Sequence, residues 1–113
     1  MPRNMSCAMT KDQVLAELKD VTRRLGWWFI KSGDVLNLVN KTMGFKKGEH
    51  PVRYKTVRVK SSRPERLDAI TQEEVIREGF PNMTCAEFIK FFIEGHKGCK
   101  PETVINRIEW EYI

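Results

Sequence analysis

Residues 19–28 read Lys-Asp-Val-Thr-Arg-Arg-Leu-Gly-Trp-Trp, and this stretch carries more information about the fold than any other. Upstream of it, Thr10 followed by Gln13 has the capping-box spacing that begins a helix, and we expect that helix to end near Lys19. Downstream, residues 21–25 are expected to extend as a strand. The stretch therefore marks the point where the chain passes from its first helix into a sheet.

Further segments on both sides have the patterns of strands and helices. The additional strands are expected at residues 5–9, 35–39, 54–59 and 104–113. Thr71 and Thr84 each precede a glutamate three residues later and so begin two helices, which Gly79 and Gly95 end. Short helices among strands predict an α+β fold, with a small mixed, mostly antiparallel sheet or barrel and short flanking helices.

Two aromatic clusters have different expected locations. In the second of these helices, the apolar spacing favours a core face made of Phe88, Phe91 and Phe92. Residues 27–29 are three consecutive aromatics that cannot all point inward from a strand. We expect two of them to pack in the core and one to lie near the surface, where it would stack against an unpaired base.

The composition is that of one globular domain spanning residues 1–113. Hydrophobic residues make up 41% of the chain and charged residues 31%, and no repeat or linker divides it. The longest apolar runs are too short to span a membrane, and the start lacks the apolar segment of a signal peptide. We therefore expect a cytoplasmic protein.

The cysteines and histidines indicate neither a disulfide framework nor a metal site. Cys7, Cys85 and Cys99 are odd in number and form no Cys-x-x-Cys pair, which favours reduced thiols. His96 and Cys99 are the closest pair of metal-ligand types in the sequence. Because a second pair is missing, we expect no metal and no cofactor.

The net charge of +5 is divided unevenly along the chain. Residues 1–66 carry 15 Lys and Arg against 6 Asp and Glu, whereas residues 67–113 carry 5 against 9. This asymmetry favours a basic surface that binds nucleic acid or a nucleotide. Two plain alternatives are that each half's charges only solvate it, or that the two halves neutralise each other.

The motifs resemble those of the ASCH domain, a relative of the PUA fold. The shared features begin with Lys-x-x-Thr-x-Arg at residues 19–24 and the Gly-Asp turn within residues 31–36. Further matches cover nearly the whole chain, at residues 66–71, 77–81, 84–88 and 107–112. The resemblance is closest to short ASCH proteins of bacteriophages, whose products act in a bacterial host. It implies a curved PUA-like barrel with a cleft, associated with RNA metabolism and nucleotide chemistry.

Two departures from the family pattern affect the expected cleft. Many members carry glycine two residues before the lysine, where this chain has Glu17, so the turn there is expected to differ in shape. Residues 41–49 form a longer and more basic insertion than the smallest members have. It is expected to act as a flap over the cleft.

The resemblance also implies catalytic roles, because one branch of the family is an acetylcytidine amidohydrolase. Its lysine, threonine and glutamate match Lys19, Thr22 and Glu78, with Glu73 and Glu74 as alternatives to Glu78 on the same helix. A neutral Lys19 amine would attack the acyl carbonyl, Glu78 would pass a proton to the leaving amine, and Thr22 would hold the lysine. The plain alternatives are a solvated cation at a helix end and a surface glutamate.

The leading interpretation is a module that binds RNA in preference to DNA, or a modified base, in a basic cleft. The residues expected to contact this ligand are Arg23, Arg24, Trp27, Lys46, Lys47 and Arg53. Arginines make bidentate contacts with phosphates, although Arg23 and Arg24 would equally neutralise acidic neighbours.

Three other functions rank below this interpretation. The amidohydrolase is second. A ribonuclease is third, because neither His50 nor His96 has an evident acid or base partner in the sequence. A phage-encoded protein that binds an acidic host protein through its basic face is a further alternative.

Overall fold

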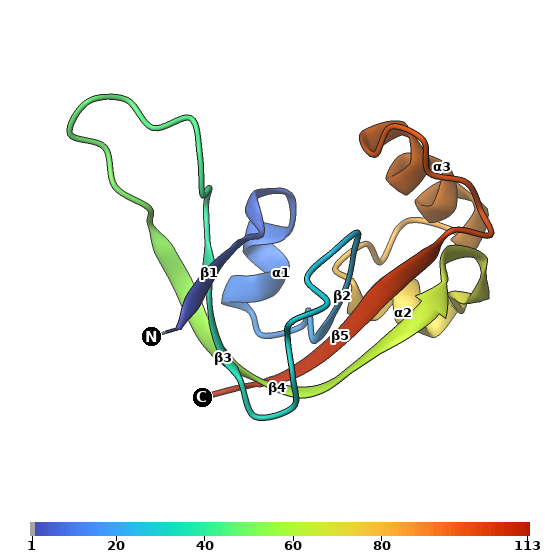
Figure 1. Ribbon diagram of the computed structural model, residues 1–113, viewed down its shortest axis with the longest axis horizontal. Coiled ribbons are helices and arrows are strands. Elements are labelled where there is room, and N and C mark those ends of the chain that lie inside the picture. Colours follow the sequence, from blue (N-terminus) through green and yellow to red (C-terminus); the bar gives the residue numbers. More distant parts are fainter. Residues whose placement is uncertain (1) are drawn as a thin grey trace.

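The computed structural model describes residues 2–113, and within them five strands form a single mixed sheet (Figure 1). The strands are β1 (Arg3–Ser6), β2 (Val21–Arg24), β3 (Val35–Val39), β4 (Arg53–Arg66) and β5 (Val104–Tyr112). They lie in the order β1-β3-β4-β5-β2, with β1 and β3 parallel and all other neighbours antiparallel. The sheet curls into a half-barrel whose edge strands are β1 and β2. The predicted α+β fold with a mostly antiparallel sheet is confirmed.

Strand β4 is the longest strand and bends the sheet. It pairs with β3 over residues 53–58 and with β5 over residues 57–66, and its register on β5 shifts between Val59 and Ser61. An irregularity of this kind bends a strand and increases its local twist. Alternation predicted only residues 54–59, because residues 60–66 are polar apart from Pro64 and show no alternation. Their pairing with β5 is what keeps them extended.

Three short α-helices accompany the sheet in the described part of the chain. They are α1 (Lys11–Leu15), α2 (Gln72–Arg77) and α3 (Cys85–Gly95), and single 3₁₀ turns lie at Ala8–Thr10 and Leu67–Ala69. Helix α1 lies within the curve of the sheet, whereas α2 and α3 lie together at one end of β4 and β5 (Figure 1). The predicted starts of α2 and α3 are confirmed, since Thr71 accepts a bond from the Glu74 amide and Thr84 forms a full capping box.

The first helical region differs from the prediction. Strand β1 ends at Ser6 instead of Met9, because the chain turns into the 3₁₀ segment. Thr10 does not cap α1, and its buried hydroxyl instead donates to the carbonyl of Cys7 at 3.5 Å. Helix α1 ends at Leu15, and Glu17 then adopts a left-handed conformation with φ of 59°. Lys19 therefore lies in the connection to β2, beyond the helix.

Two groups of buried apolar side chains form the interior, and a polar seam separates them. The first core contains Met5, Val14, Leu36, Leu38, Val57 and Trp110 with their neighbours, inside the curve of the sheet. The second core lies under α2 and α3 and contains Leu67, Val75, Phe88, Phe92 and Ile105 with theirs. Along β5 the change from Ile105 to Ile108 passes through buried Asn106 and Arg107. The interior is therefore apolar at both ends and polar between them.

The aromatic residues 27–29 are placed differently from the prediction. Trp27 is partly buried and packs against the first core, but Trp28 and Phe29 are 53% and 50% exposed. The expectation of two core aromatics is wrong, because Gly26 and Trp27 both have positive φ values and turn the chain away from the sheet. On α3, Phe88 and Phe92 are buried as predicted, whereas Phe91 is partly exposed.

The remaining general expectations concern thiols and membranes. Cys7, Cys85 and Cys99 are all free. Among residues 2–113, none of the helices has the length and apolar character needed to cross a bilayer.

A tight contact between Gly79 and Thr10 joins α2 to the first helical region and can be tested. Gly79 has φ of 102°, and a Cβ there would lie 2.9 Å from Cγ2 of Thr10. Gly79→Ala is expected to destabilise the protein by roughly 2–4 kcal/mol, because backbone strain and overpacking add. Gly98 also has positive φ but open space around it, so Gly98→Ala should cost only roughly 1 kcal/mol. Urea unfolding measures both values, and equal losses would contradict the tight contact.

Candidate functional site

The backbone carbonyl of Lys19 is held by two hydrogen bonds, and its side chain is buried. Its carbonyl accepts hydrogen bonds from Trp110 Nε1, at 3.0 Å, and from the hydroxyl of Tyr112. Burial raises the pKa of Tyr112 to about 12, so this hydroxyl keeps its proton and remains a donor. The Lys19 residue is 3% exposed. The strand β5 therefore fixes the backbone from which the amine points inward.

Glu78 meets Lys19 from the end of α2. The Lys19 Nζ donates to the Glu78 carbonyl at 2.5 Å and lies 3.2 Å from the carboxylate oxygen Oε1. The other carboxylate oxygen of Glu78 accepts from Arg23 at 3.2 Å, and Glu78 is 3% exposed. Glu78 is thus the glutamate that reaches the lysine, whereas Glu73 is exposed and Glu74 binds other partners.

Thr22 lies on β2 but does not hold the lysine. Its Oγ1 accepts from Arg24 Nε at 3.2 Å, and among the described residues it makes no hydrogen bond to Lys19. The expected threonine to lysine bond is therefore replaced by a threonine to arginine bond. The Thr22 hydroxyl still lies in the same pocket as Lys19 and Glu78, and its hydrogen is available to a ligand.

The two terminal nitrogens of Arg23 are occupied by carboxylates. Its NH2 lies 2.9 Å from both Glu65 and Glu74, its NH1 lies 3.2 Å from Glu78, and its side chain is 1% exposed. Within the described part of the chain, its Nε is buried with no hydrogen-bond partner. This arrangement matches the neutralising role weighed for Arg23, and it leaves the guanidinium with no open face for a phosphate.

The surrounding charges form an Arg–Glu network on α2, β2, β4 and β5, made of Arg23, Arg77, Arg107, Glu65, Glu74, Glu78 and Glu109. Burial alone would raise the pKa of Glu74, but hydrogen bonds from Arg107 and Arg23 lower it to about 2. Burial likewise opposes ionisation of Glu109, and bonds from Arg77 and Arg107 lower its pKa. Glu74 and Glu109 are therefore ionised at neutral pH, and their ion pairs with Arg77 and Arg107 hold α2 against the sheet.

Arg24 is the cation that faces the opening of the half-barrel. It has no acidic partner among residues 2–113, and its NH2 donates to the Ser6 carbonyl at 2.7 Å. Ser6 ends β1 and Arg24 ends β2, so this bond joins the two edge strands across the opening. The same guanidinium lines the pocket described next.

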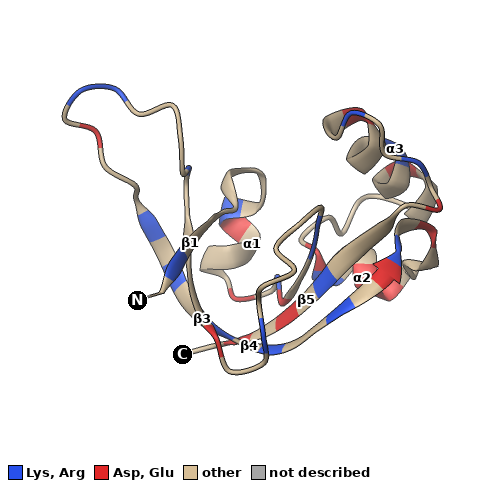
Figure 2. Ribbon diagram, in the orientation of Figure 1, with Lys and Arg blue, Asp and Glu red and all other residues tan. Residues whose placement is uncertain are grey.

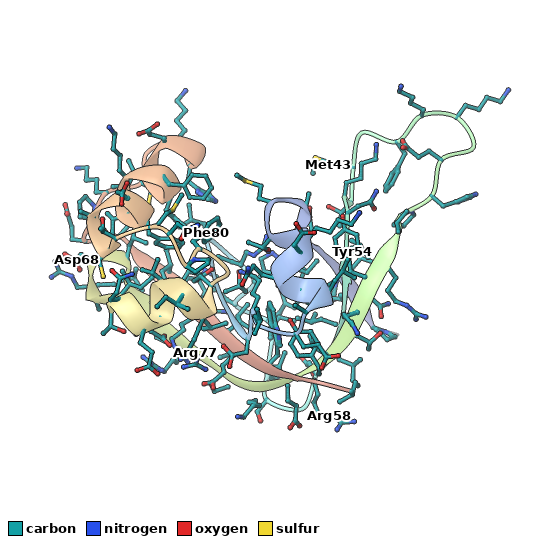
Figure 3. All side chains as sticks on the ribbon, turned by 180° about the vertical axis from the view of Figure 1, so that it is seen from behind. Met43, Tyr54, Arg58, Asp68, Arg77 and Phe80 are labelled. Atoms are coloured by element: carbon teal, nitrogen blue, oxygen red, sulfur yellow. The ribbon has the colours of Figure 1, made fainter. Side chains whose placement is uncertain are left out.

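A pocket of about 370 Å³ opens between the edge strands and α3. Its polar side carries Lys19, Thr22, Arg23, Arg24 and Glu78, which come from β2, the segment before it and the end of α2. Its apolar side carries Phe80, Phe88, Phe91, Phe92 and His96. Phe80 is labelled in Figure 3, where it lies on the side of α2 and α3 that faces α1. The pocket therefore combines charged groups with aromatic faces.

The structure brings some predicted residues together and leaves others apart. Lys19, Thr22, Glu78, Arg23 and Arg24 all line the pocket. The other four do not: Trp27 packs on the first core, Lys46 and Lys47 lie on the connection between β3 and β4, and Arg53 begins β4. Their contact with a ligand stays a prediction.

The aromatic wall and the buried network were missed by sequence analysis. The helical spacing of Phe88, Phe91 and Phe92 fits a core face, and nothing in that spacing shows that Phe91 borders a cavity. His96 stacks on Phe92 with ring centroids 4.1 Å apart, and its Nδ1 lies 2.7 Å from the Phe92 carbonyl. Within the described residues, no cluster of three His, Cys, Asp or Glu side chains is arranged to hold a metal ion.

The strands form a half-barrel domain with a pocket beside its edge strands, and comparisons with known proteins agree with the fold. An ASCH domain from Lactobacillus crispatus JV V101 matches 98% of this chain and 79% of its own, with a TM-score of 0.68 and 12% identity. A protein from Enterococcus faecalis V583 carrying the family name DUF984 matches 100% of this chain and 76% of its own, with a TM-score of 0.71 and 12% identity.

These likenesses establish the fold, which is that of the ASCH domain. The chain matches no family model and no curated protein. Both structural matches come from bacteria, and the expected link to bacteriophage proteins finds no support among them.

Glu74 gives the network a pH dependence. Because its pKa falls from 4.5 to about 2 on folding, its stabilisation is present above pH 4.5 and is lost as the pH falls toward 2. Glu74→Gln should cost roughly 2 kcal/mol at pH 7 after allowance for solvent screening, and should flatten the acid limb of stability. Glu73→Gln, on the exposed side of α2, should change stability by less than about 0.5 kcal/mol. Urea unfolding between pH 7 and 2 measures both, and parallel pH profiles for the two variants would refute the assignment.

Proposed function

We propose that the pocket binds a nucleobase of a nucleoside or of RNA, with preference for a modified base. The observation that carries this proposal is the convergence of Lys19, Thr22, Arg24 and Glu78 opposite a wall of phenylalanines. A volume of about 370 Å³ lies at the small end of ligand sites, which suits one base.

Each side of the pocket suits one property of a base. A flat ring stacks on aromatic side chains, and each such contact contributes about 1–3 kcal/mol. The polar edge of a base needs both donors and acceptors, and the pocket offers donors on Lys19, Thr22 and Arg24 with an acceptor on Glu78. A mixed polar and aromatic pocket of this kind is how proteins recognise unstacked bases.

A second candidate function is hydrolysis of an acyl group from the exocyclic amine of such a base. The observation that favours it is the buried contact of 3.2 Å between Lys19 Nζ and Glu78, at the wall of the pocket. Direct attack by Lys19 is unattractive, because it would leave an acyl-lysine amide as stable as the substrate. Attack by water uses the same residues and avoids that intermediate.

The hydrolysis then proceeds with balanced proton transfers. Glu78 takes a proton from the attacking water as the C–O bond forms, and the Lys19 ammonium stabilises the oxyanion. Glu78 next gives that proton to the leaving amine as the C–N bond breaks. The products are a carboxylic acid and the free base, and the Thr22 hydroxyl orients the acyl oxygen by donating to it.

Base binding is tested by calorimetric titration with cytidine and acetylcytidine. Phe91→Ala is expected to raise Kd roughly 5- to 150-fold, because one stacking contact is lost. Phe29→Ala removes an exposed aromatic that lies outside the pocket, and it should leave Kd unchanged. Absence of binding by the unmodified protein, or equal weakening in both variants, would sink the proposal.

Hydrolysis is tested by following release of cytidine from acetylcytidine. Glu78→Gln is expected to lower kcat roughly 10²- to 10⁴-fold, because the general base is lost. Since this variant leaves the buried Lys19 amine without a carboxylate partner, Thr22→Val provides a milder second test with an intact ion pair. Thermal melts confirm folding of both. If Glu78→Gln turned over acetylcytidine as fast as the unmodified protein, the hydrolysis proposal would be refuted, but the base-binding proposal would stand.

A further inference from the structure

The connection between β3 and β4, residues 40–52, is a projecting loop with a defined shape (Figure 1). At its base, Asn40 Oδ1 accepts from the amides of Lys41 and Val52 at 2.9 and 2.8 Å. Near its tip, Glu49 pairs with Lys41 at 2.7 Å and accepts from the Lys46 amide at 2.9 Å. These bonds join the two sides of the loop both at its base and farther out.

Two lysines of this loop, and the arginine that follows it at the start of β4, have no acidic partner within residues 2–113. Glu49 is its one acidic residue, and Lys41 takes that charge. Lys46, Lys47 and Arg53 form no ion pair within residues 2–113, and all three are exposed. Figure 2 shows the basic residues along the loop, well away from the Arg–Glu network beside α2. The loop is thus a source of uncompensated positive charge.

Hydrogen bonds connect the stem of the loop to the wall of the pocket. The Ser6 hydroxyl donates to the Asn40 carbonyl at 3.3 Å, and the Cys7 amide donates to the Val39 carbonyl at 2.9 Å. Ser6 and Cys7 both line the pocket, and Ser6 also accepts from Arg24. The stem of the loop therefore adjoins the rim of the pocket where Arg24 lies.

We propose that this loop binds the phosphate backbone of a single-stranded nucleic acid whose base occupies the pocket, so that the ligand is a polynucleotide in place of a free nucleoside. This inference rests on the proposed function of the pocket. Lys46 and Lys47 on the loop and Arg53 just after it are separate exposed cations, which suits regularly spaced phosphates. A single strand is required, because a base must be unstacked to enter the pocket.

The test compares two double variants that remove equal charge. Lys46→Ala with Lys47→Ala alters the loop, and Lys31→Ala with Arg58→Ala alters exposed residues near the start of β3. In Figure 3, the label Met43 locates the loop and the label Arg58 locates the control surface. Each protein is titrated into labelled single-stranded RNA of about 12 nucleotides with one acetylcytidine. The acetylcytidine nucleoside is titrated separately by calorimetry.

The loop variant is expected to weaken RNA binding roughly 25-fold at about 0.1 M salt, and to make the slope of log K against log salt shallower by about 1.4. Its affinity for the nucleoside should stay unchanged, and the control variant should bind both ligands almost as the unmodified protein does. RNA binding that is equal in the two variants, or displacement of RNA by polyglutamate as effective as by unlabelled RNA, would overturn the inference.

The two proposals fail in different ways. If the nucleoside binds but the loop variant behaves like its control, the pocket proposal stands and the polynucleotide inference is wrong. If the unmodified protein does not bind the nucleoside, the pocket proposal fails, whatever the loop variant does to RNA binding. Phe91→Ala separates the cases further, because it should weaken the binding of both the RNA and the nucleoside.

Discussion

The carboxylate of Glu78, shared between Lys19 and Arg23, is the contact on which the arrangement of this domain depends. It joins the end of α2 to β2 and to the segment before it, between the two apolar cores. Buried charges are costly unless each one is paired and hydrogen-bonded. Here the cost is offset because both oxygens of Glu78 have partners and because Glu74 compensates Arg23 and Arg107. A site of this kind tolerates little change in any one member.

The same contacts change the meaning of the uneven charge distribution along the chain. Arg23 comes from the basic half and binds Glu74 and Glu78 of the acidic half, and Arg77 of the acidic half binds Asp20. Much of the imbalance along the sequence therefore cancels inside the folded domain. Part of the charge that remains lies on the loop between β3 and β4, where Lys46 and Lys47 are exposed. A count of charges by sequence position identified the basic half correctly but not the part of it that is free.

The features that the sequence predicted well depend on neighbours in the chain. Residues 35–39 are mostly apolar and follow a tight turn, and Thr84 with Glu87 forms a capping box, so both elements were placed correctly. The Thr10 capping box failed because the buried Thr10 hydroxyl donates to the carbonyl of Cys7, a bond that the capping pattern does not show. Lys19 and Glu78 are separated by 59 positions, and only the family resemblance linked them. Phe91 shows the same limit, because helical spacing does not distinguish a cavity wall from a core.

The bond between Arg24 and Ser6 has a consequence for the behaviour of the protein in concentrated solution. A half-barrel that leaves room for a ligand must also leave two sheet edges unpaired, and such edges attract strands from other molecules. In this domain both edges are only four residues long, and a guanidinium spans the gap between them. Arg24 lines the pocket and also covers the gap between the two unpaired edges, so a substitution at Arg24 is expected to promote aggregation as well as to change the pocket.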